Sequence, residues 1–343
     1  MSSPRLRYQM DQWRGYRYTM NKTILVTGCA GFIGGNFVRQ FKKEFPKIKI
    51  IGIDDFSTGR REALDRSIAF YEGSILNEGL LEKIFSRHKP AYVFHFAAIP
   101  RVLYSIEHPR RTSEANIIGT VALLEASKKY GVKRFIYSSS SSVYGGAKKL
   151  PTKESENPPD PTSPYAAQKY AGEQFCRIFS ALFGIDAVCL RYFNVFGPGQ
   201  YGDSPYSSVI SGWLESLYVP GKKKLFLEGD GSQSRDFCYV DNAVLANILA
   251  MQSKKDFRGE AINIAHGRRT TINEVKRLIE ECRGKKLHLE KRPPRAGDVR
   301  HSHADISKAR KMLGYRPNIS FEEGLARTIA WFEGRTKKNA IRK

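Results

Sequence analysis

Short apolar runs alternate with longer amphipathic stretches through the first two thirds of the chain. The runs are rich in Ile, Val, Phe and Tyr, which is typical of buried strands, and apolar residues at helical spacing follow most of them. Strands that alternate with helices form a parallel sheet covered by helices on both faces. The pattern therefore predicts a doubly wound α/β sheet with strands over 23–27, 48–53, 69–71, 92–96, 134–137 and 187–192.

The intervening helices are expected after the first strand and over 80–87, 112–130 and 164–183, which gives a Rossmann-type fold. Beyond Gly197, glycine and proline interrupt the pattern, so we expect a smaller C-terminal α/β lobe there. Residues 261–265 are expected to return one strand to the sheet. The predicted organisation is a basic N-terminal extension (1–21), a sheet domain (22–196, with a return segment at about 240–265), a smaller lobe (197–239 and 266–333) and a basic tail (334–343).

Composition narrows the class of protein. The chain has 343 residues and a formal charge of +23, spread along its whole length. No nucleic-acid motif accompanies this charge, so we expect phosphate-bearing small molecules as partners and no nucleic acid. No apolar run is long enough for a membrane span. The five cysteines form no Cys-x-x-Cys pair and no metal-binding pattern, so we expect a cytoplasmic protein with reduced cysteines and no metal.

A glycine-rich turn joins the first strand to the first helix. Gly28, Gly31 and Gly34 are spaced as G-x-x-G-x-x-G, with Phe32 and Ile33 between the last two. In this context glycines let the backbone approach a pyrophosphate, and the helix N-terminus offers free amides to it. A chance glycine-rich turn is the alternative interpretation.

Asp54 ends the second strand, 26 residues after Gly28. A carboxylate at this strand end accepts both ribose hydroxyls and repels a 2′-phosphate, which favours NAD over NADP. The alternative is an aspartate that only forms a turn. Ala97 ends the fourth strand and is small, as close approach of a cofactor requires.

Tyr165 and Lys169 lie four residues apart at the start of a predicted helix, which Ser163 caps and Pro164 begins. One helical turn separates them, so they share a face. A nearby ammonium favours the phenolate, and a hydroxyl that donates to the phenolate favours it further. Tyr-x-x-x-Lys is therefore one way to make tyrosine an acid–base catalyst. The spacing also occurs by chance on exposed helices.

Together with the serine run 138–142, these features resemble the extended short-chain dehydrogenase/reductase family over about 22–332. Further motifs are similar to its sugar-nucleotide branch. They are Arg-Tyr-Phe-Asn-Val-Phe-Gly-Pro at 191–198, Gly-Asp-Gly at 229–231, Ser-Arg-Asp-Phe at 234–237, Arg-Ala-Gly-Asp-Val-Arg at 295–300 and Ala-Asp at 304–305.

The resemblance implies an NAD-binding sheet domain, a lobe that binds a UDP-sugar, and a homodimer. Arginine side chains can present paired donors to a diphosphate, Asp298 can accept from a ribose hydroxyl, and Phe226 can stack on uracil. The expected cofactor contacts are Gly28, Gly31, Phe32, Ile33, Gly34, Asp54, Ala97, Asn116, Tyr165 and Lys169. The expected substrate contacts are Ser140, Ser141, Ser142, Asn194, Val209, Trp213, Phe226, Arg235, Arg295, Asp298 and Ser302.

The reaction type depends on the residues after the catalytic hydroxyl, Ser140. Sugar-nucleotide dehydratases of the family carry Asp-Glu there, whereas this chain has Ser141 and Ser142. The resemblance therefore implies a 4-epimerase. Tyr165 takes the proton of the sugar 4-hydroxyl, hydride passes from C4 to NAD⁺, the 4-keto sugar turns over, and hydride returns to its other face.

Ser302 stands where galactose-specific epimerases have a bulky tyrosine, which favours the N-acetylated pair UDP-GlcNAc and UDP-GalNAc over plain hexoses. Two positions depart from the family pattern. Ser74 replaces an aspartate that meets adenine, and Arg101 replaces a small residue near the sugar. Arg101 either faces solvent or meets a C6 carboxylate, so a UDP-hexuronic acid epimerase or decarboxylase stays open, as does a non-catalytic NAD-binding regulator.

Overall fold

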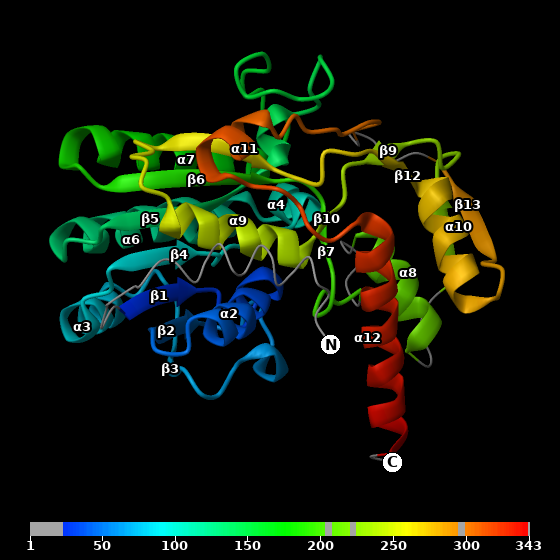
Figure 1. Ribbon diagram of the computed structural model, residues 1–343, viewed down its shortest axis with the longest axis horizontal. Coiled ribbons are helices and arrows are strands. Elements are labelled where there is room, and N and C mark those ends of the chain that lie inside the picture. The colour runs from blue at the N-terminus through cyan, green and yellow to red at the C-terminus, as the bar shows by residue number, and fades with distance from the viewer. Residues whose placement is uncertain (1–22, 203–207, 220–223, 294–298, 342–343) are drawn as a thin grey trace.

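The computed structural model describes residues 23–202, 208–219, 224–293 and 299–341, and the side chains as far as residue 336. A seven-stranded parallel sheet forms its centre (Figure 1). The strand order is β11-β6-β5-β4-β1-β2-β3, so the order reverses beside β1. The strands are β1 (Thr23–Thr27), β2 (Lys49–Asp54), β3 (Ala69–Glu72), β4 (Tyr92–His95), β5 (Arg134–Ser140), β6 (Asp186–Tyr192) and β11 (Glu260–Ile264).

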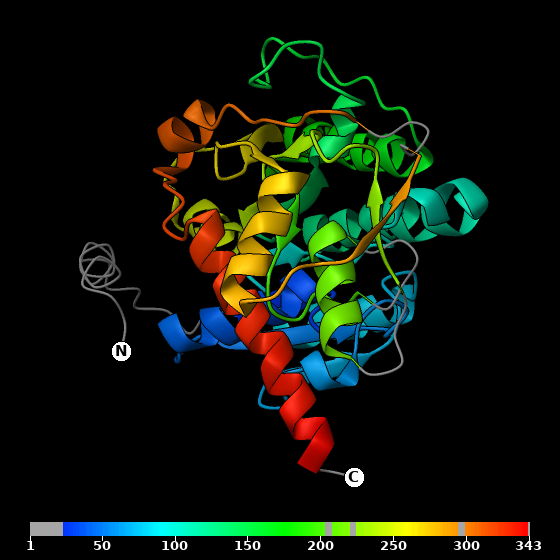
Figure 2. The ribbon, with the colours of Figure 1, turned by 90° about the vertical axis from the view of Figure 1, so that its right-hand side faces the viewer.

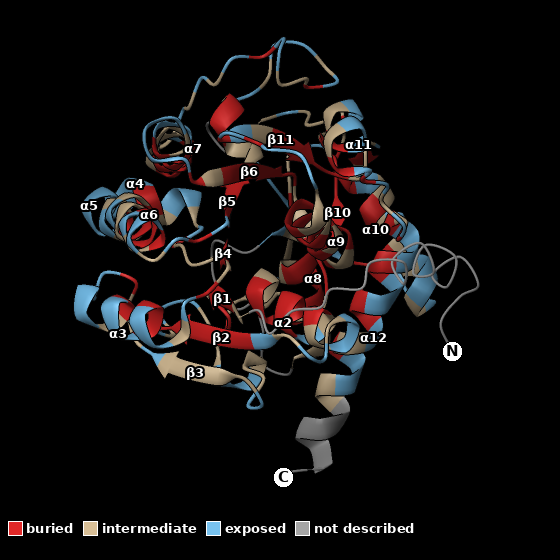
Figure 3. Cartoon of the chain, turned by 60° about the vertical axis from the view of Figure 1, so that its left-hand side comes forward, coloured by how far each residue is buried: buried red, intermediate tan, exposed pale blue. Residues whose placement is uncertain are grey.

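The six predicted strands and the returning strand are confirmed, and helices cover both faces of the sheet. Strand β1 shows why, because Ile24 and Val26 point into one core and Leu25 into the other. On the first face lie α2 (Phe32–Glu44), α9 (Val240–Gln252) and α11 (Ser307–Leu313); on the second lie α3 (Glu78–His88), α6 (Gly119–Lys129) and α7 (Pro164–Phe183). Figure 3 shows the buried strands between helices whose outer faces are exposed.

The predicted helix over 112–130 differs in detail. It consists of α5 (Pro109–Ser113), a wider π-helical turn (Glu114–Ile118) and α6, and a short helix, α4 (Val102–Glu107), precedes it. Asn116 lies in the π-helical turn and is buried. Such turns often occur at functional sites, and this one lies at the carboxyl edge of the sheet.

The smaller lobe packs around its own apolar core, which includes Trp213, Phe237 and Phe332. Its helices are α8 (Val209–Tyr218), α10 (Ile272–Arg283) and α12 (Phe321–Ile341) (Figure 2). Helix α12 continues through most of the stretch predicted as a basic tail. Three strand pairs complete the lobe: β7 (Val195–Phe196) with β10 (Cys238–Tyr239), β9 (Ser234–Arg235) with β12 (Thr270–Thr271), and β8 (Leu225–Glu228) with β13 (Leu289–Arg292).

The described residues bear on the predictions about membrane spans, metal sites and cysteines. Within these ranges no helix is both long and apolar enough to cross a membrane. The same ranges contain no cluster of three or more His, Cys, Asp or Glu side chains suited to a metal ion. All five cysteines are unpaired, and only Cys282 is exposed. The predicted N-terminal extension lies outside the described residues.

Candidate active site

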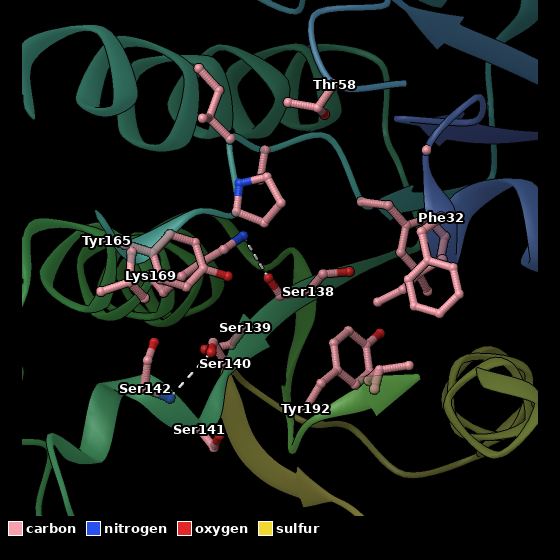
Figure 4. A pocket seen from close by; sticks show the side chains of 18 of the residues that line it. Phe32, Thr58, Ser138, Ser139, Ser140, Ser141, Ser142, Tyr165, Lys169 and Tyr192 are labelled. Atoms are coloured by element: carbon pink, nitrogen blue, oxygen red, sulfur yellow. Dashed lines mark hydrogen bonds between the residues drawn. The ribbon is translucent and has the colours of Figure 1, made fainter. Parts of the chain in front are cut away.

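A cavity of about 690 Å³ lies at the carboxyl edge of the sheet, between the sheet domain and the smaller lobe. This is where open α/β sheets bind ligands. Figure 4 shows Phe32 of α2 on one side of this space and Tyr165, Lys169 and the serine run on the other. The predicted residues that line it are Gly28, Gly31, Phe32, Ile33, Gly34, Asp54, Ala97, Ser140, Ser141, Ser142, Tyr165, Lys169, Asn194, Arg235 and Ser302.

The glycine turn needs glycine at two of its positions. Gly28 has a φ of 68°, and a Cβ on it would lie 2.7 Å from the backbone nitrogen of Ala97. A Cβ on Gly34 would lie 2.1 Å from the carbonyl oxygen of Gly28. The turn is therefore packed against β4 and against the first turn of α2, and side chains cannot separate its backbone from a ligand.

Asp54 is held firmly at the end of β2. One carboxylate oxygen accepts from the backbone N–H of Ala30 at 2.9 Å, and the other accepts from that of Phe56 at 2.8 Å. Burial raises the pKa of this carboxyl, and the two backbone hydrogen bonds oppose the rise. Each oxygen keeps a second lone pair for a ligand hydroxyl. Ser74 also lines this end of the cavity.

Asn116 does not line the cavity and instead braces its wall. Its side-chain oxygen accepts from the N–H of Ile99 at 2.8 Å, and its amide donates to the Ile99 carbonyl at 3.2 Å and to Gln168 at 2.9 Å. Ile99 lines the cavity. A cofactor contact by Asn116 stays a prediction.

Tyr165 and Lys169 occupy the predicted first turns of α7. Ser163 caps the helix by accepting from the N–H of Ala166 at 3.2 Å. The Lys169 ammonium donates to the Ser138 carbonyl at 2.8 Å and lies 6.0 Å from the centre of the Tyr165 ring. Both side chains therefore enter the cavity from one helical face (Figure 4).

Burial disfavours the charged form of both groups. It raises the pKa of the Tyr165 phenol to about 12, and a hydrogen bond with Ser140 opposes the rise. It lowers the pKa of the Lys169 ammonium to about 8, and the nearby Glu173 carboxylate opposes the fall. The Ser140 hydroxyl and the ammonium are thus the described groups beside Tyr165 that favour its phenolate.

The serine run supplies hydroxyls with different roles. Ser140 accepts from the N–H of Ser142 at 3.1 Å, whereas Ser139, which also lines the cavity, donates to the buried Glu173 carboxylate. The hydroxyl oxygens of Ser138 and Ser142 are buried, and neither has a hydrogen-bond partner among the described residues. Buried hydroxyls usually have partners, so a polar ligand is expected to supply them.

These observations fit a dinucleotide. The glycine turn has no room for a side chain at Gly28 or Gly34, Asp54 offers carboxylate oxygens, and Ser138 offers a hydroxyl without a partner among the described residues. Gly28, Gly31 and Gly34 would hold the pyrophosphate, and Asp54 would hold a ribose.

On the lobe side, Asn194 and Ser302 form one wall. The Asn194 amide donates to the Ser302 hydroxyl at 2.9 Å and to the Asp236 carbonyl at 3.3 Å. The Asp236 carboxylate is buried and accepts from the N–H groups of His266, Gly267 and Ala304, each at 3.1 Å. Asp236 thus joins three segments behind the wall, which fixes the position of Ser302.

Three predicted substrate residues do not line the cavity. Trp213 is buried in the core of the lobe, and its indole N–H donates to the Phe226 carbonyl at 2.9 Å. The Arg292 guanidinium lies 3.2 Å from the centre of the Phe226 ring and covers it. Val209 packs against the same core. Arg295 and Asp298 lie outside the described residues, and a substrate contact by any of these five stays a prediction.

The structure adds residues that the sequence reasoning missed. Thr152 and Thr162, from the segment that precedes α7, line the cavity, as do Tyr192 and His301. Only the position of His301 beside Ser302 could have drawn attention to it. Arg101 does not line the cavity, although Pro100 and Val102 on either side of it do.

Comparison with known proteins agrees with this geometry. The model of the NAD dependent epimerase/dehydratase family matches residues 24–265. The chain belongs to this family. The match spans the glycine turn, Asp54, Ser140, Tyr165 and Lys169, and it confirms the family and the cofactor, NAD, that the motifs predicted.

Similar proteins of this family include three 4-epimerases. A UDP-glucose 4-epimerase structure from Thermotoga maritima is 41% identical, with a TM-score of 0.86 over 91% of this chain and 99% of that one. A UDP-N-acetylglucosamine 4-epimerase structure from Methanobrevibacter ruminantium is 37% identical, with a TM-score of 0.85 over 92% and 100%. A UDP-glucuronate 4-epimerase of Thermodesulfobacterium geofontis is 36% identical over 90% of this chain and 95% of its own. The family member described here thus falls among the UDP-sugar 4-epimerases, which differ in their sugar.

Proposed function

We propose that this epimerase interconverts UDP-N-acetylglucosamine and UDP-N-acetylgalactosamine, with UDP-glucose and UDP-galactose as secondary substrates. The observation that carries the proposal is the small side chain of Ser302 on the cavity wall, where its hydroxyl meets the Asn194 amide at 2.9 Å. A residue of this size leaves room beside the sugar for an acetamido group. The relative from Methanobrevibacter ruminantium, which carries UDP-N-acetylglucosamine in its name, supports this choice.

The residues of the chain divide the proton chemistry among them. Tyr165 removes the proton of the sugar 4-hydroxyl and later returns it, as a positioned acid–base group. Ser140 donates to the oxygen that becomes the 4-keto oxygen, and Lys169 supplies the positive charge that favours the phenolate. Bound NAD⁺ supplies the reversible two-electron oxidation at C4.

Epimerisation suits the cavity better than dehydration. Asp54 and Asp55 are the carboxylates among its described lining residues; Asp54 ends β2 near the glycine turn, and Asp55 directly follows it. The serine run, which lies beside Tyr165, offers hydroxyls only. A dehydratase needs an acid beside the sugar to protonate the leaving hydroxyl.

A neutral sugar also suits the cavity better than a hexuronic acid. Among the described residues, Lys169, Arg235 and His301 line the cavity with groups that can be positive. Lys169 is committed to the Ser138 carbonyl and to Tyr165, and Arg101 does not line the cavity. Arg235 is expected at the diphosphate, so no other lysine or arginine among the described lining residues is left for a C6 carboxylate. UDP-hexuronic acid epimerase or decarboxylase activity is therefore the second candidate. A non-catalytic regulator would not need Ser140, Tyr165 and Lys169 gathered at one cavity.

A single NMR experiment tests the proposal. The purified protein is incubated separately with UDP-GlcNAc, UDP-glucose and UDP-glucuronic acid, with and without added NAD, and the anomeric protons are followed. We expect UDP-GlcNAc to be converted fastest. Fastest conversion of UDP-glucuronic acid would replace this substrate assignment, and no conversion in any sample would favour the regulator.

We also propose that the enzyme is a cytoplasmic homodimer in which helices α6 and α7 pack against their copies. Ile178, Leu182 and Phe183 on α7 are exposed, Leu182 to 70%, and so is Ile118 just before α6. Exposed apolar patches of this kind mark interaction sites. Light scattering after size-exclusion chromatography tests this, and a monomeric mass at micromolar concentration would contradict it.

A further inference from the structure

His301 lines the cavity between two residues that the proposed function uses. Arg235 lies on one side of it, because the Arg235 guanidinium donates at 3.2 Å to the carbonyl of Arg300, the residue before His301. Ser302, which faces the sugar in our proposal, follows it in sequence. His301 therefore lies between the group expected at the diphosphate and the group expected at the hexose.

The position of the His301 ring is fixed by Ser234. The two residues form a parallel bridge, in which the Ser234 N–H donates to the Arg300 carbonyl and the Ser302 N–H donates to the Ser234 carbonyl, both at 3.0 Å. In addition, the Ser234 hydroxyl lies 2.9 Å from Nδ1 of His301. The backbone on both sides of the histidine and one ring nitrogen are thus tied to a buried residue.

The second ring nitrogen, Nε2, is left for a ligand. No hydrogen bond joins it to any of the residues that the structure describes. When the Ser234 hydroxyl donates to Nδ1, the ring proton is on Nε2, and a protonated ring likewise carries a proton there. A ring held in this way presents an N–H donor to the cavity.

The charges around His301 favour an anion. Arg235 lines the cavity beside it, and the nearby carboxylate of Asp236 is turned inward, toward three backbone N–H groups. Among the described residues, Asp230 and Arg300 also lie near this segment, and neither lines the cavity. As far as the structure describes this wall, the groups that face the ligand near His301 are therefore positive or neutral.

We propose that Nε2 of His301 donates a hydrogen bond to the diphosphate of the bound UDP-sugar, next to Arg235. The inference rests on the proposed function, since it needs a nucleoside diphosphate in this cavity. Hydrogen bonds to charged groups contribute about 1.5–3 kcal/mol, so loss of this one should weaken binding by about tenfold or more.

Two substitutions separate the ring nitrogens. The amide of H301N can reach the position of Nδ1 and keep the contact with Ser234, but it cannot reach that of Nε2. The longer side chain of H301Q places an amide N–H near Nε2. The matched control is H303N, because His303 lies in the same segment, bonds through Nε2 to the Gly267 carbonyl at 3.3 Å and does not line the cavity.

Calorimetric titration with UDP and with uridine, which lacks the diphosphate, tests the proposal. For H301N we expect UDP to bind about tenfold more weakly and uridine to bind unchanged, with a raised KM and a nearly unchanged kcat. The affinities of H301Q and H303N for UDP and for uridine should stay close to those of the unmodified protein. Equal UDP affinity in H301N, or equal loss of UDP and uridine affinity, would overturn the inference and leave the proposed function standing.

NMR of the unmodified protein gives a second test that does not depend on a variant. Addition of UDP should shift the Nε2 resonance of His301, while addition of uridine should not. An Nε2 resonance that does not shift on addition of UDP would overturn the inference. Failure of the unmodified protein to bind UDP at all would overturn the proposed function together with it.

Discussion

Arg191 donates from two guanidinium nitrogens to both carboxylate oxygens of Glu173, at 2.8 and 2.6 Å. Glu173 lies on α7, one helical turn after Lys169. The pair is buried, with Glu173 3% exposed, and Ser139 donates to the same carboxylate. The ion pair therefore ties α7, which carries Tyr165 and Lys169, to β6, and the Ser139 hydroxyl ties the same carboxylate to the end of β5, which carries Ser140.

Removal of Glu173 should destabilise the fold. In E173A the guanidinium of Arg191 stays buried without its counter-charge, which typically costs about 3–5 kcal/mol of unfolding free energy. Urea denaturation monitored by circular dichroism measures the change. E72A is the control, because the Arg61–Glu72 pair is exposed and such pairs contribute little; equal losses in the two variants would contradict this account.

Loss of the Tyr165 hydroxyl should abolish turnover without loss of cofactor. Y165F keeps the ring but removes the acid–base group, so we expect kcat to fall by at least ~100-fold. NMR measures conversion, and the nucleotide released on denaturation measures retained NAD. Y170F, on the same helix but outside the cavity, should convert substrate normally; full activity in Y165F would disprove the proposed chemistry.

The glycine turn predicts a sharp effect on cofactor binding. In G34A the new Cβ would lie 2.1 Å from the Gly28 carbonyl oxygen, so the turn must open. We expect the purified variant to hold little NAD, as measured by absorbance of the released nucleotide. G334A is the matched control, since a Cβ there meets nothing within 4 Å. Undiminished NAD in G34A would show that the turn does not bind the pyrophosphate.

Ser302 should set the sugar preference. A tyrosine in S302Y would fill the space beside Asn194, and pocket contacts of this kind discriminate by about 10- to 200-fold. We expect UDP-GlcNAc turnover to fall by that factor relative to UDP-glucose turnover. S302A removes the hydroxyl without filling the space and should keep the preference; an unchanged ratio in S302Y would locate the acetamido group elsewhere.

Acid should destabilise the protein through His95. This side chain is buried between Thr27 and Thr120, with ring nitrogens 2.8 and 2.9 Å from their hydroxyls, and burial lowers its pKa from 6.5 to about 3. As the pH falls, the His95 side chain binds a proton in the unfolded chain before it does so in the folded one. The stability that the neutral, buried ring contributes is therefore complete above about pH 6.5 and is lost as the pH falls. Between pH 6.5 and about pH 5 the loss amounts to about 2 kcal/mol of unfolding free energy.

The variant H95Q should show a flatter dependence of unfolding free energy on pH over this range. H288Q is its control, because it makes the same substitution at an exposed histidine. Denaturant titrations at a series of pH values measure both. Parallel pH curves for H95Q and the unmodified protein would show that another group causes the acid loss.

Local patterns predicted the sheet and the placement of Tyr165 and Lys169 on one helix, because strand periodicity and helix spacing act over a few residues. The surroundings of Phe226 could not be predicted in the same way. They depend on β13, which pairs with β8 from a distant part of the sequence and brings Arg292 over the ring. Likewise, the bracing role of Asn116 depends on Ile99 and Gln168, and the role of Glu173 on Arg191.

The carboxylate of Asp236 has a consequence for how the enzyme is made. Its backbone partners, His266, Gly267 and Ala304, lie late in the chain. During translation, the glycine turn, Tyr165 and Lys169 are therefore synthesised well before the segment that carries Ser302. The nascent chain thus acquires the proposed acid–base residues first and the proposed sugar pocket last. Premature termination before residue 304 would yield a chain that carries Tyr165 and Lys169 but lacks the Ala304 N–H that binds Asp236 behind Ser302.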